Sequence, residues 1–140
     1  MRDSPRESVC DYLAGMLSLR LRDPASVRQA LERLSRRTTA SGIAVALAQS
    51  LRGHELFAAG RFDDAVRAFD AGIIDVSDVV RAQSPVLQQY IDRFVRAQAL
   101  DSLGRLADAT RWYRSLRDGP TVWGAPFLAA WIAGDPSTRH

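Results

Sequence analysis

Two stretches of the chain, Gly60-Arg61-Phe62-Asp63-Asp64-Ala65 and Gly104-Arg105-Leu106-Ala107-Asp108-Ala109, carry the same pattern of residue types. An aromatic residue follows each alanine by four positions, at Phe69 and Tyr113. A glycine placed after an apolar helical stretch ends one helix and opens a tight turn into the next. The alanine allows the second helix to approach its partner closely, and the aromatic side chain fills the neighbouring gap. We therefore expect two helix pairs, each of which turns at its glycine.

The same pattern recurs in weaker form elsewhere in the chain. Arg22, Val27 and Leu31 form an earlier unit, and a last unit begins at Gly134. The turn positions 22, 60, 104 and 134 are separated by 38, 44 and 30 residues. Internal repeats of this period predict helix pairs that stack on one another.

Helical periodicity supports an all-α fold. Apolar residues recur at the spacing of one helical face over residues 25–35, 43–59, 62–69 and 86–103. Asp23-Pro24 and Ser84-Pro85 each place a capping side chain before a proline, which favours the start of a helix. No stretch shows a convincing strand-like alternation of apolar and polar residues.

These residues resemble the tetratricopeptide repeat family, whose units combine a small residue, a glycine-like turn, an alanine and an aromatic residue. The matching residues are Gly53, Gly60, Ala65 and Phe69 in one unit and Ala97, Gly104, Ala109 and Tyr113 in the next. The resemblance extends from about Val9 to Gly134. The chain departs from the family where large apolar residues are usual early in the first helix, and here has Gln49, Arg52, Arg93 and Arg96.

The resemblance implies a right-handed stack of three antiparallel helix pairs and one terminal helix, about seven helices in all. We expect one domain over residues 1–140, which is either a complete protein or a fragment of a longer one. The uneven spacing of the turns indicates a divergent, irregular array, and the resemblance suggests a bacterial one. Similar arrays lie at the C-terminal ends of large bacterial regulators, so the resemblance also implies a regulatory setting.

In the resembling family, the first helix of each pair lines a concave groove that binds a partner. The same register in this chain places in the groove Tyr12, Met16, Leu19, Leu47, Ser50, His54, Phe57, Ile91, Phe94, Gln98 and Asp101. This predicted surface is mostly apolar, which suits an amphipathic helix or an extended apolar peptide. Some family members hold a peptide carboxylate with lysines and asparagines, and this chain has neither residue type. We predict a non-catalytic scaffold that binds a protein or peptide.

Candidate catalytic and metal-binding residues are few. His54-Glu55 lacks the second histidine that a zinc protease needs four residues later, because position 58 is alanine. Cys10, the only cysteine, has no nucleophile motif around it, and we expect it to be a small buried apolar residue. Asp63-Asp64 fits the start of a helix, where acidic residues favour the positive end of the helix dipole. We therefore expect no catalytic residue, no metal site and no cofactor.

The charge balance leaves one alternative function open. All 19 basic residues are arginine, the acidic residues number 16, and the net charge is +3. Arginines cluster near the ends of predicted helices, where they complement the helix dipole, at Arg33, Arg36, Arg37, Arg111, Arg114 and Arg117. A nucleic-acid surface usually carries a larger excess of positive charge. An arginine-mediated nucleic-acid-binding module is therefore the alternative to protein binding.

The last part of the chain is rich in large apolar residues. Trp112, Tyr113, Trp123, Phe127 and Trp131 form the densest aromatic group, which is either core packing or a partner's contact site. A helix is expected over 125–133, and only four residues follow Pro136, too few for a further stable helix. We expect self-association or docking of a further segment at Phe127, Leu128, Trp131 and Ile132. The alternative is that these four side chains fold inward and the helix is itself the cap.

The chain carries no sign of a membrane or secretory destination. No apolar run approaches the about 20 residues of a membrane-spanning helix. The first residues lack the apolar core and cleavage site of a secretory signal. We expect a cytoplasmic protein that does not bind a membrane.

Overall fold

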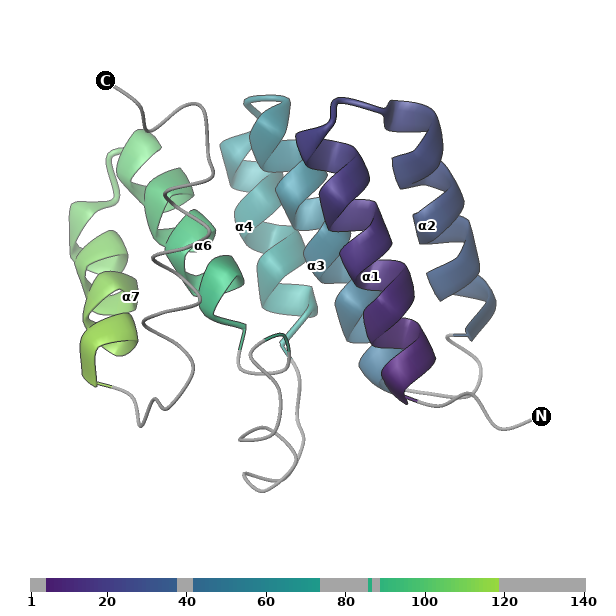
Figure 1. The fold of residues 1–140 in the computed structure, drawn as a ribbon. Helices are drawn as coiled ribbons and strands as arrows, with labels where there is room; N and C mark the ends of the chain where they lie inside the picture. The colour runs from purple at the N-terminus through teal and green to yellow at the C-terminus, as the bar shows by residue number, and fades with distance from the viewer. Residues whose placement is uncertain (1–4, 38–41, 74–85, 87–88, 119–140) are drawn as a thin grey trace. The chain divides into compact units, whose positions relative to one another are not determined.

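A computed structural model describes residues 5–37, 42–73, 86 and 89–118 of the chain (Figure 1). Over these residues it consists of helices and turns without a strand, which confirms the all-α class. The helices are α1 (Pro5–Arg20), α2 (Pro24–Arg37), α3 (Gly42–Ala58), α4 (Phe62–Ala71), α6 (Tyr90–Ser102) and α7 (Leu106–Asp118). The chain divides into two compact units, Met1–Ile74 with α1 to α4 and Asp75–His140 with α6 and α7.

The observed helices agree with the predicted apolar faces. The faces over 25–35, 43–59 and 62–69 correspond to α2, α3 and α4. The face over 86–103 corresponds to α6, which begins at Tyr90. The predicted cap at Ser84-Pro85, the helix over 125–133 and the unit at Gly134 lie outside the described residues.

The three helix pairs α1–α2, α3–α4 and α6–α7 turn through the same backbone motif. Gly60 and Gly104 both have a φ of +76°, and Arg22 has a φ of +57°. The residue after each of them donates its N–H to a carbonyl five positions earlier: Asp23 to Ser18, Arg61 to Leu56 and Arg105 to Leu100, each at 2.9 Å. The turn residue itself donates three positions back, at 3.1 Å for Arg22, 3.0 Å for Gly60 and 2.9 Å for Gly104. These two bonds define a Schellman motif, so the weaker unit predicted at Arg22 shares the turn of the other two.

The residue after each turn also anchors the second helix of its pair. Arg61 pairs with Asp64 at 2.6 Å, and Arg105 pairs with Asp108 at 2.9 Å. In the first pair Asp23 takes this place and caps α2, because its carboxylate accepts hydrogen bonds from the N–H and the hydroxyl of Ser26 at 3.2 and 2.6 Å. The predicted cap at Asp23-Pro24 is therefore confirmed.

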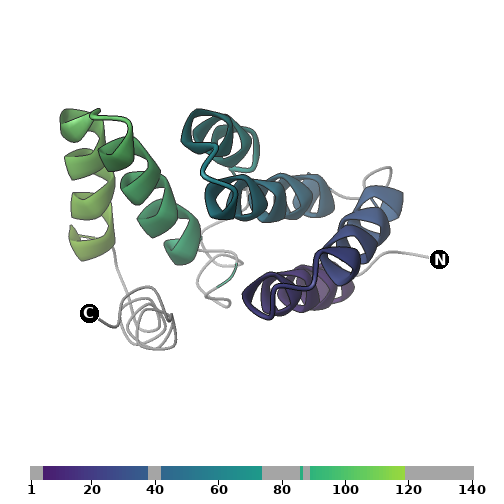
Figure 2. The ribbon, with the colours of Figure 1, turned by 90° about the horizontal axis from the view of Figure 1, so that it is seen from above.

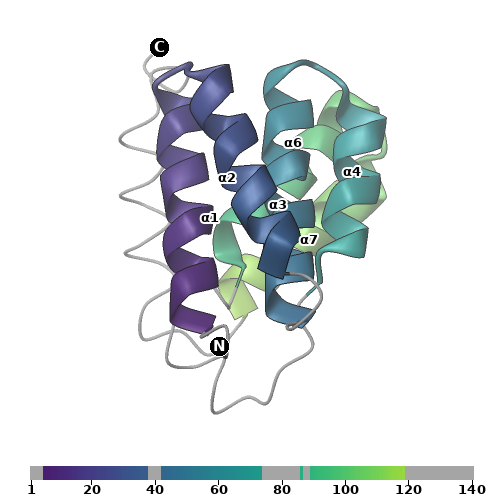
Figure 3. The same cartoon turned by 90° about the vertical axis from the view of Figure 1, so that its right-hand side faces the viewer.

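In the first unit, α3 packs against α1, α2 and α4 (Figures 2 and 3). Two glycines make this close approach possible. A Cβ at Gly15 in α1 would overlap the side chain of Leu51 in α3, and a Cβ at Gly53 would lie 2.7 Å from the ring of Phe69 in α4. Leu51 and Phe69 are almost completely buried, together with Leu34, Leu47 and Val27.

In the second unit, α6 packs against α7. Ala97 and Ala109 are buried, as the repeated pattern predicts for the small residues of a pair, and Leu100 is buried beside them in the sequence of α6. Ala97 lies seven residues before its turn residue, the same separation as Gly53 from Gly60 and Gly15 from Arg22. The three pairs therefore share both a turn and a position for a small residue.

Candidate protein-binding surfaces

Most of the groove residues predicted in the first unit belong to its core. Tyr12, Met16, Leu47 and His54 are all at most 5% exposed, and Ser50 is 1% exposed. The hydroxyls of Tyr12 and Ser50 lie 3.0 Å apart and join α1 to α3. These side chains hold the helices of the unit together, and a ligand could not contact them in this structure.

His54 occupies a packed aromatic environment. Its ring meets the edge of Phe69 with the ring centroids 4.9 Å apart and the planes 73° from parallel. The described residues contain no group of three or more His, Cys, Asp or Glu side chains arranged to hold a metal ion.

Phe57 is the predicted groove residue of the second helix pair that stays partly exposed. It lies three residues before the turn residue Gly60, and Leu19 occupies the same place in the first pair and is also partly exposed. The ring of Phe57 packs at 5.3 Å from that of Phe62, across the turn between α3 and α4. Phe57 and Phe62 thus form an aromatic pair that a ligand can reach.

A second accessible aromatic pair lies in the other unit. Phe94 of α6 contacts Tyr113 of α7 with the ring centroids 6.1 Å apart, and Tyr113 is 37% exposed. Gln98 is partly exposed and Asp101 is exposed, whereas Ile91 is buried. Partial burial raises the pKa of Tyr113, and the negative charge of Asp101 raises it further. The phenol therefore remains a neutral hydrogen-bonding group at physiological pH.

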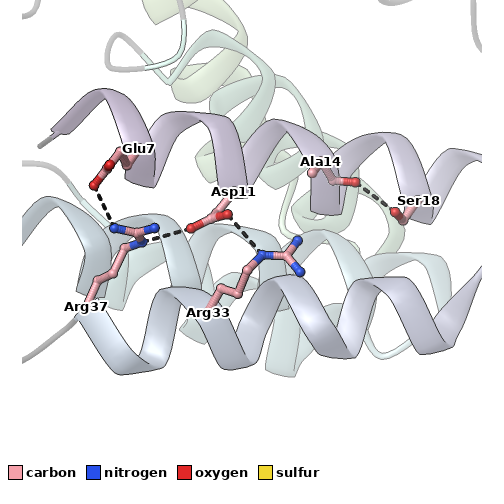
Figure 4. Close-up of polar contacts among 6 residues, drawn as sticks. All are labelled: Glu7, Asp11, Ala14, Ser18, Arg33 and Arg37. Atoms are coloured by element: carbon pink, nitrogen blue, oxygen red, sulfur yellow. Dashed lines mark hydrogen bonds and ion pairs between the residues drawn. The ribbon is translucent and has the colours of Figure 1, made fainter. Parts of the chain in front are cut away.

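Two of the arginines in the cluster at the end of α2 are engaged within the first unit (Figure 4). Asp11 accepts hydrogen bonds from Nε of Arg33 at 2.9 Å and from Nε of Arg37 at 2.8 Å. Arg37 also binds Glu7 at 2.9 Å. The carboxylate of Asp11 raises the pKa of Arg37. These arginines tie α2 to α1, and Arg36 beside them remains exposed.

Arg96 in α6 is a further arginine with a structural role. It is 3% exposed, and its guanidinium lies 4.1 Å from the centre of the Trp112 ring. In the resembling pattern this position carries a large apolar residue. Here the guanidinium of Arg96 stacks on the ring of Trp112, so a partly apolar and partly charged side chain packs where the family has an apolar one.

The structure adds two features that the sequence analysis missed. Gly15 is the small residue of the first pair. The sequence pattern did not mark it, because the turn residue seven positions later is arginine and not glycine. The expectation that Cys10 is buried is wrong, since the thiol is exposed on α1. Cys10 lies on the same side of α1 as Leu13 and Leu17, which are 45% and 59% exposed.

The predicted C-terminal contact residues Phe127, Leu128, Trp131 and Ile132, like Trp123, lie outside the described residues. None of the helices that the structure describes is long and apolar enough to cross a membrane. Comparisons of the chain with protein-family models, with curated proteins and with solved structures gave no match.

Proposed function

We propose that this chain is a non-catalytic scaffold that binds another protein or a peptide through a tetratricopeptide-like array of helix pairs. In this proposal the array is a right-handed stack of about seven helices and forms part of a cytoplasmic bacterial regulatory protein. The ligand is an amphipathic helix or an extended apolar segment.

The repeated geometry of the helix pairs supports an array. In all three pairs the turn residue has a left-handed conformation, the turn has the same two hydrogen bonds, and a small residue lies seven positions before the turn. Repeat architectures present extended surfaces, and binding other macromolecules is their usual role.

The observation that carries the binding proposal is the pair of accessible aromatic contacts, Phe57 with Phe62 and Phe94 with Tyr113. Each joins the first helix of a pair to the second, so a rigid scaffold holds it in place. Aromatic side chains that stay partly exposed on rigid elements are typical anchors of protein interfaces. Most of the remaining predicted groove residues are buried, so Phe57 and Phe94 are the accessible aromatic residues of the predicted surface, beside the exposed Asp101.

The alternative function, arginine-mediated nucleic-acid binding, draws support from the exposed Arg36 and Arg114. Many other arginines already have acidic partners or aromatic contacts in the described part of the chain. Arg33, Arg37, Arg61, Arg67 and Arg105 all form ion pairs. Paired arginines contribute less to a phosphate-binding surface than free ones, so the protein-binding proposal is preferred.

A displayed library of helical peptides tests the proposed function. The immobilised protein should enrich apolar, amphipathic sequences, and Phe57→Ala and Phe94→Ala should weaken their capture more than they lower the unfolding temperature. Leu106→Ala is the matched control, because it also removes an accessible apolar side chain, which is 61% exposed and outside both aromatic pairs. Failure to enrich any sequence, or equal loss of capture in the control, would count against the proposal.

A further inference from the structure

One side of α6 combines an aromatic ring, an amide and a carboxylate. Phe94, Gln98 and Asp101 follow one another at intervals of four and three residues, which places them on the same side of the helix. Phe94 and Gln98 are partly exposed, and Asp101 is exposed. Tyr113 of α7 is 37% exposed and joins this surface through its ring contact with Phe94. We call these four residues the α6–α7 site.

The carboxylate of Asp101 is not neutralised within the part of the chain that the structure describes. It forms no ion pair with a described residue, whereas Asp108 of α7 lies 2.9 Å from Arg105 and 3.9 Å from Arg111. Asp101 also lies in the last turn of α6, which has no basic residue, and the negative end of the helix dipole adds to its charge there. Burial raises the pKa of Tyr113 and the charge of Asp101 raises it further, so the negative charge acts on the phenol.

Aromatic rings beside a carboxylate are suited to a cation. The face of a phenylalanine or tyrosine ring attracts a guanidinium or ammonium group, and a carboxylate adds a charged hydrogen bond. The same unit already uses the first of these contacts internally. The guanidinium of Arg96 lies 4.1 Å from the centre of the Trp112 ring, and that of Arg93 lies 5.5 Å from the centre of the Tyr90 ring. The negative charge at the α6–α7 site would repel a phosphate, so charge complementarity favours a basic group.

We propose that the α6–α7 site binds a basic side chain of the partner peptide. Its cation lies against the rings of Phe94 and Tyr113 and pairs with the carboxylate of Asp101. This inference rests on the proposed function, because it states which chemical group of the peptide the second aromatic pair recognises. An amphipathic helix can carry such a side chain at the border of its apolar face, with the alkyl stem on the apolar surface. One charged contact adds only a shallow salt dependence, unlike the many phosphate contacts of a nucleic acid.

A displayed library of helical peptides with mixed polar positions tests the proposal. The apolar positions are leucine, and each polar position holds arginine, glutamine or glutamate in equal proportions. The library is selected on the wild type, on Asp101→Asn and on Glu32→Gln. Glu32 is an exposed acid of α2, so Glu32→Gln is the matched control that removes one negative charge from the other unit. The wild type and the control should enrich arginine over glutamate at one polar position, although a net charge of +3 by itself favours acidic peptides.

A matched pair of peptides then measures the contact. The most enriched sequence is synthesised with arginine or with citrulline, its neutral isostere, at the selected position. The wild type and Glu32→Gln should bind the arginine peptide about fivefold more tightly than the citrulline peptide. Asp101→Asn should lose most of this preference, and its thermal unfolding should match that of the wild type, because Asp101 is exposed.

The outcomes separate this inference from the proposed function. Enriched peptides without an arginine preference, whose capture Phe94→Ala still weakens, would overturn the inference and leave the proposed function standing. An arginine preference that persists in Asp101→Asn, or that Glu32→Gln loses to the same extent, would also overturn it, because the preference would then not come from Asp101. Failure to enrich any peptide would contradict the proposed function itself and this inference with it.

Discussion

Single residues decide how closely neighbouring helices approach, both within a pair and between two pairs. Gly15 and Gly53 stand where a side chain would collide with Leu51 and Phe69. The sequence identified Gly53, because it precedes a glycine turn and an aromatic residue at the expected distances. It did not identify Gly15, because Arg22 and Leu31 replace the glycine and the aromatic residue that mark the other units.

Gly53→Ala should destabilise the protein. A Cβ at this position would lie 2.7 Å from a Phe69 ring that is 1% exposed and cannot move away easily. Overpacking costs about 1–3 kcal/mol, and the higher helix propensity of alanine returns at most about 1 kcal/mol. Gly42→Ala is the control, since no atom lies within 4 Å of its added Cβ. Urea unfolding should show a loss of stability for Gly53→Ala only. An equal gain of stability in both variants would contradict the close contact between Gly53 and Phe69.

Arg22→Gly should stabilise the first helix pair. Arg22 has a φ of +57°, a left-handed conformation that glycine adopts at the equivalent positions 60 and 104. Relief of that strain, less the extra chain entropy of glycine when unfolded, should gain about 0.5–1 kcal/mol. Thermal unfolding measures the change, and a lower melting temperature in Arg22→Gly would show that the arginine makes a compensating contact.

At the scale of the element, each second helix is defined by its first turn and by one buried small residue. The sequence predicted this arrangement for α4 and α7 because the stretches at Gly60 and Gly104 share glycine, arginine, aspartate and alanine at the same spacing. The groove positions on the first helices were less predictable. A helical register shows which side chains share a face, but it does not show that α3 lies against both α1 and α2 and buries Tyr12 and His54.

Ala65→Glu and Ala109→Glu should each destabilise the fold by several kcal/mol. The two alanines are 0% and 3% exposed, so the new carboxylate would be placed inside a helix contact without a partner. Ala71→Glu and Ala107→Glu place the same residue on exposed positions of the same helices, α4 and α7. Chemical unfolding should show a much larger loss of stability for Ala65→Glu and Ala109→Glu than for the two exposed controls. Melting curves that do not distinguish Ala65→Glu from Ala71→Glu would mean that the repeat register is wrong.

The cap of α2 should give the protein a measurable acid response. Hydrogen bonds from the side chain and then the backbone of Ser26 lower the pKa of Asp23 below its usual 3.8. A carboxyl with a lowered folded pKa stabilises the fold fully above its unfolded pKa and loses that contribution as the pH falls through the folded value. Asp23→Asn keeps a capping side chain but does not titrate.

The stability advantage of the wild type over Asp23→Asn should therefore shrink as the pH falls below about 4. Urea unfolding of both proteins between neutral and acidic pH measures it. An advantage that stays constant, or one that grows in acid, would show that Asp23 is not the titrating cap.

At the scale of the whole molecule, the described residues form two compact units built from three similar helix pairs. The sequence predicted the all-α class and three of its turns, since these depend on local spacing. It could not predict which surfaces stay open, because burial depends on contacts between pairs. Leu13 and Leu51 occupy equivalent positions before their turns, yet Leu13 is 45% exposed and Leu51 is fully buried against α1 at Gly15.

Salt dependence of binding tests the central claim, that the chain recognises apolar protein segments, most directly. A peptide enriched from the helical library and a mixed-sequence DNA duplex are titrated against the protein at low and at physiological salt. We predict that the peptide binds with nearly the same affinity at both salt concentrations and loses affinity with Phe57→Ala or Phe94→Ala, because the contact is apolar. Binding to phosphates weakens steeply with salt. Tighter binding of the duplex, with a steep loss at higher salt and no effect of the two phenylalanine substitutions, would contradict the account and favour the nucleic-acid alternative.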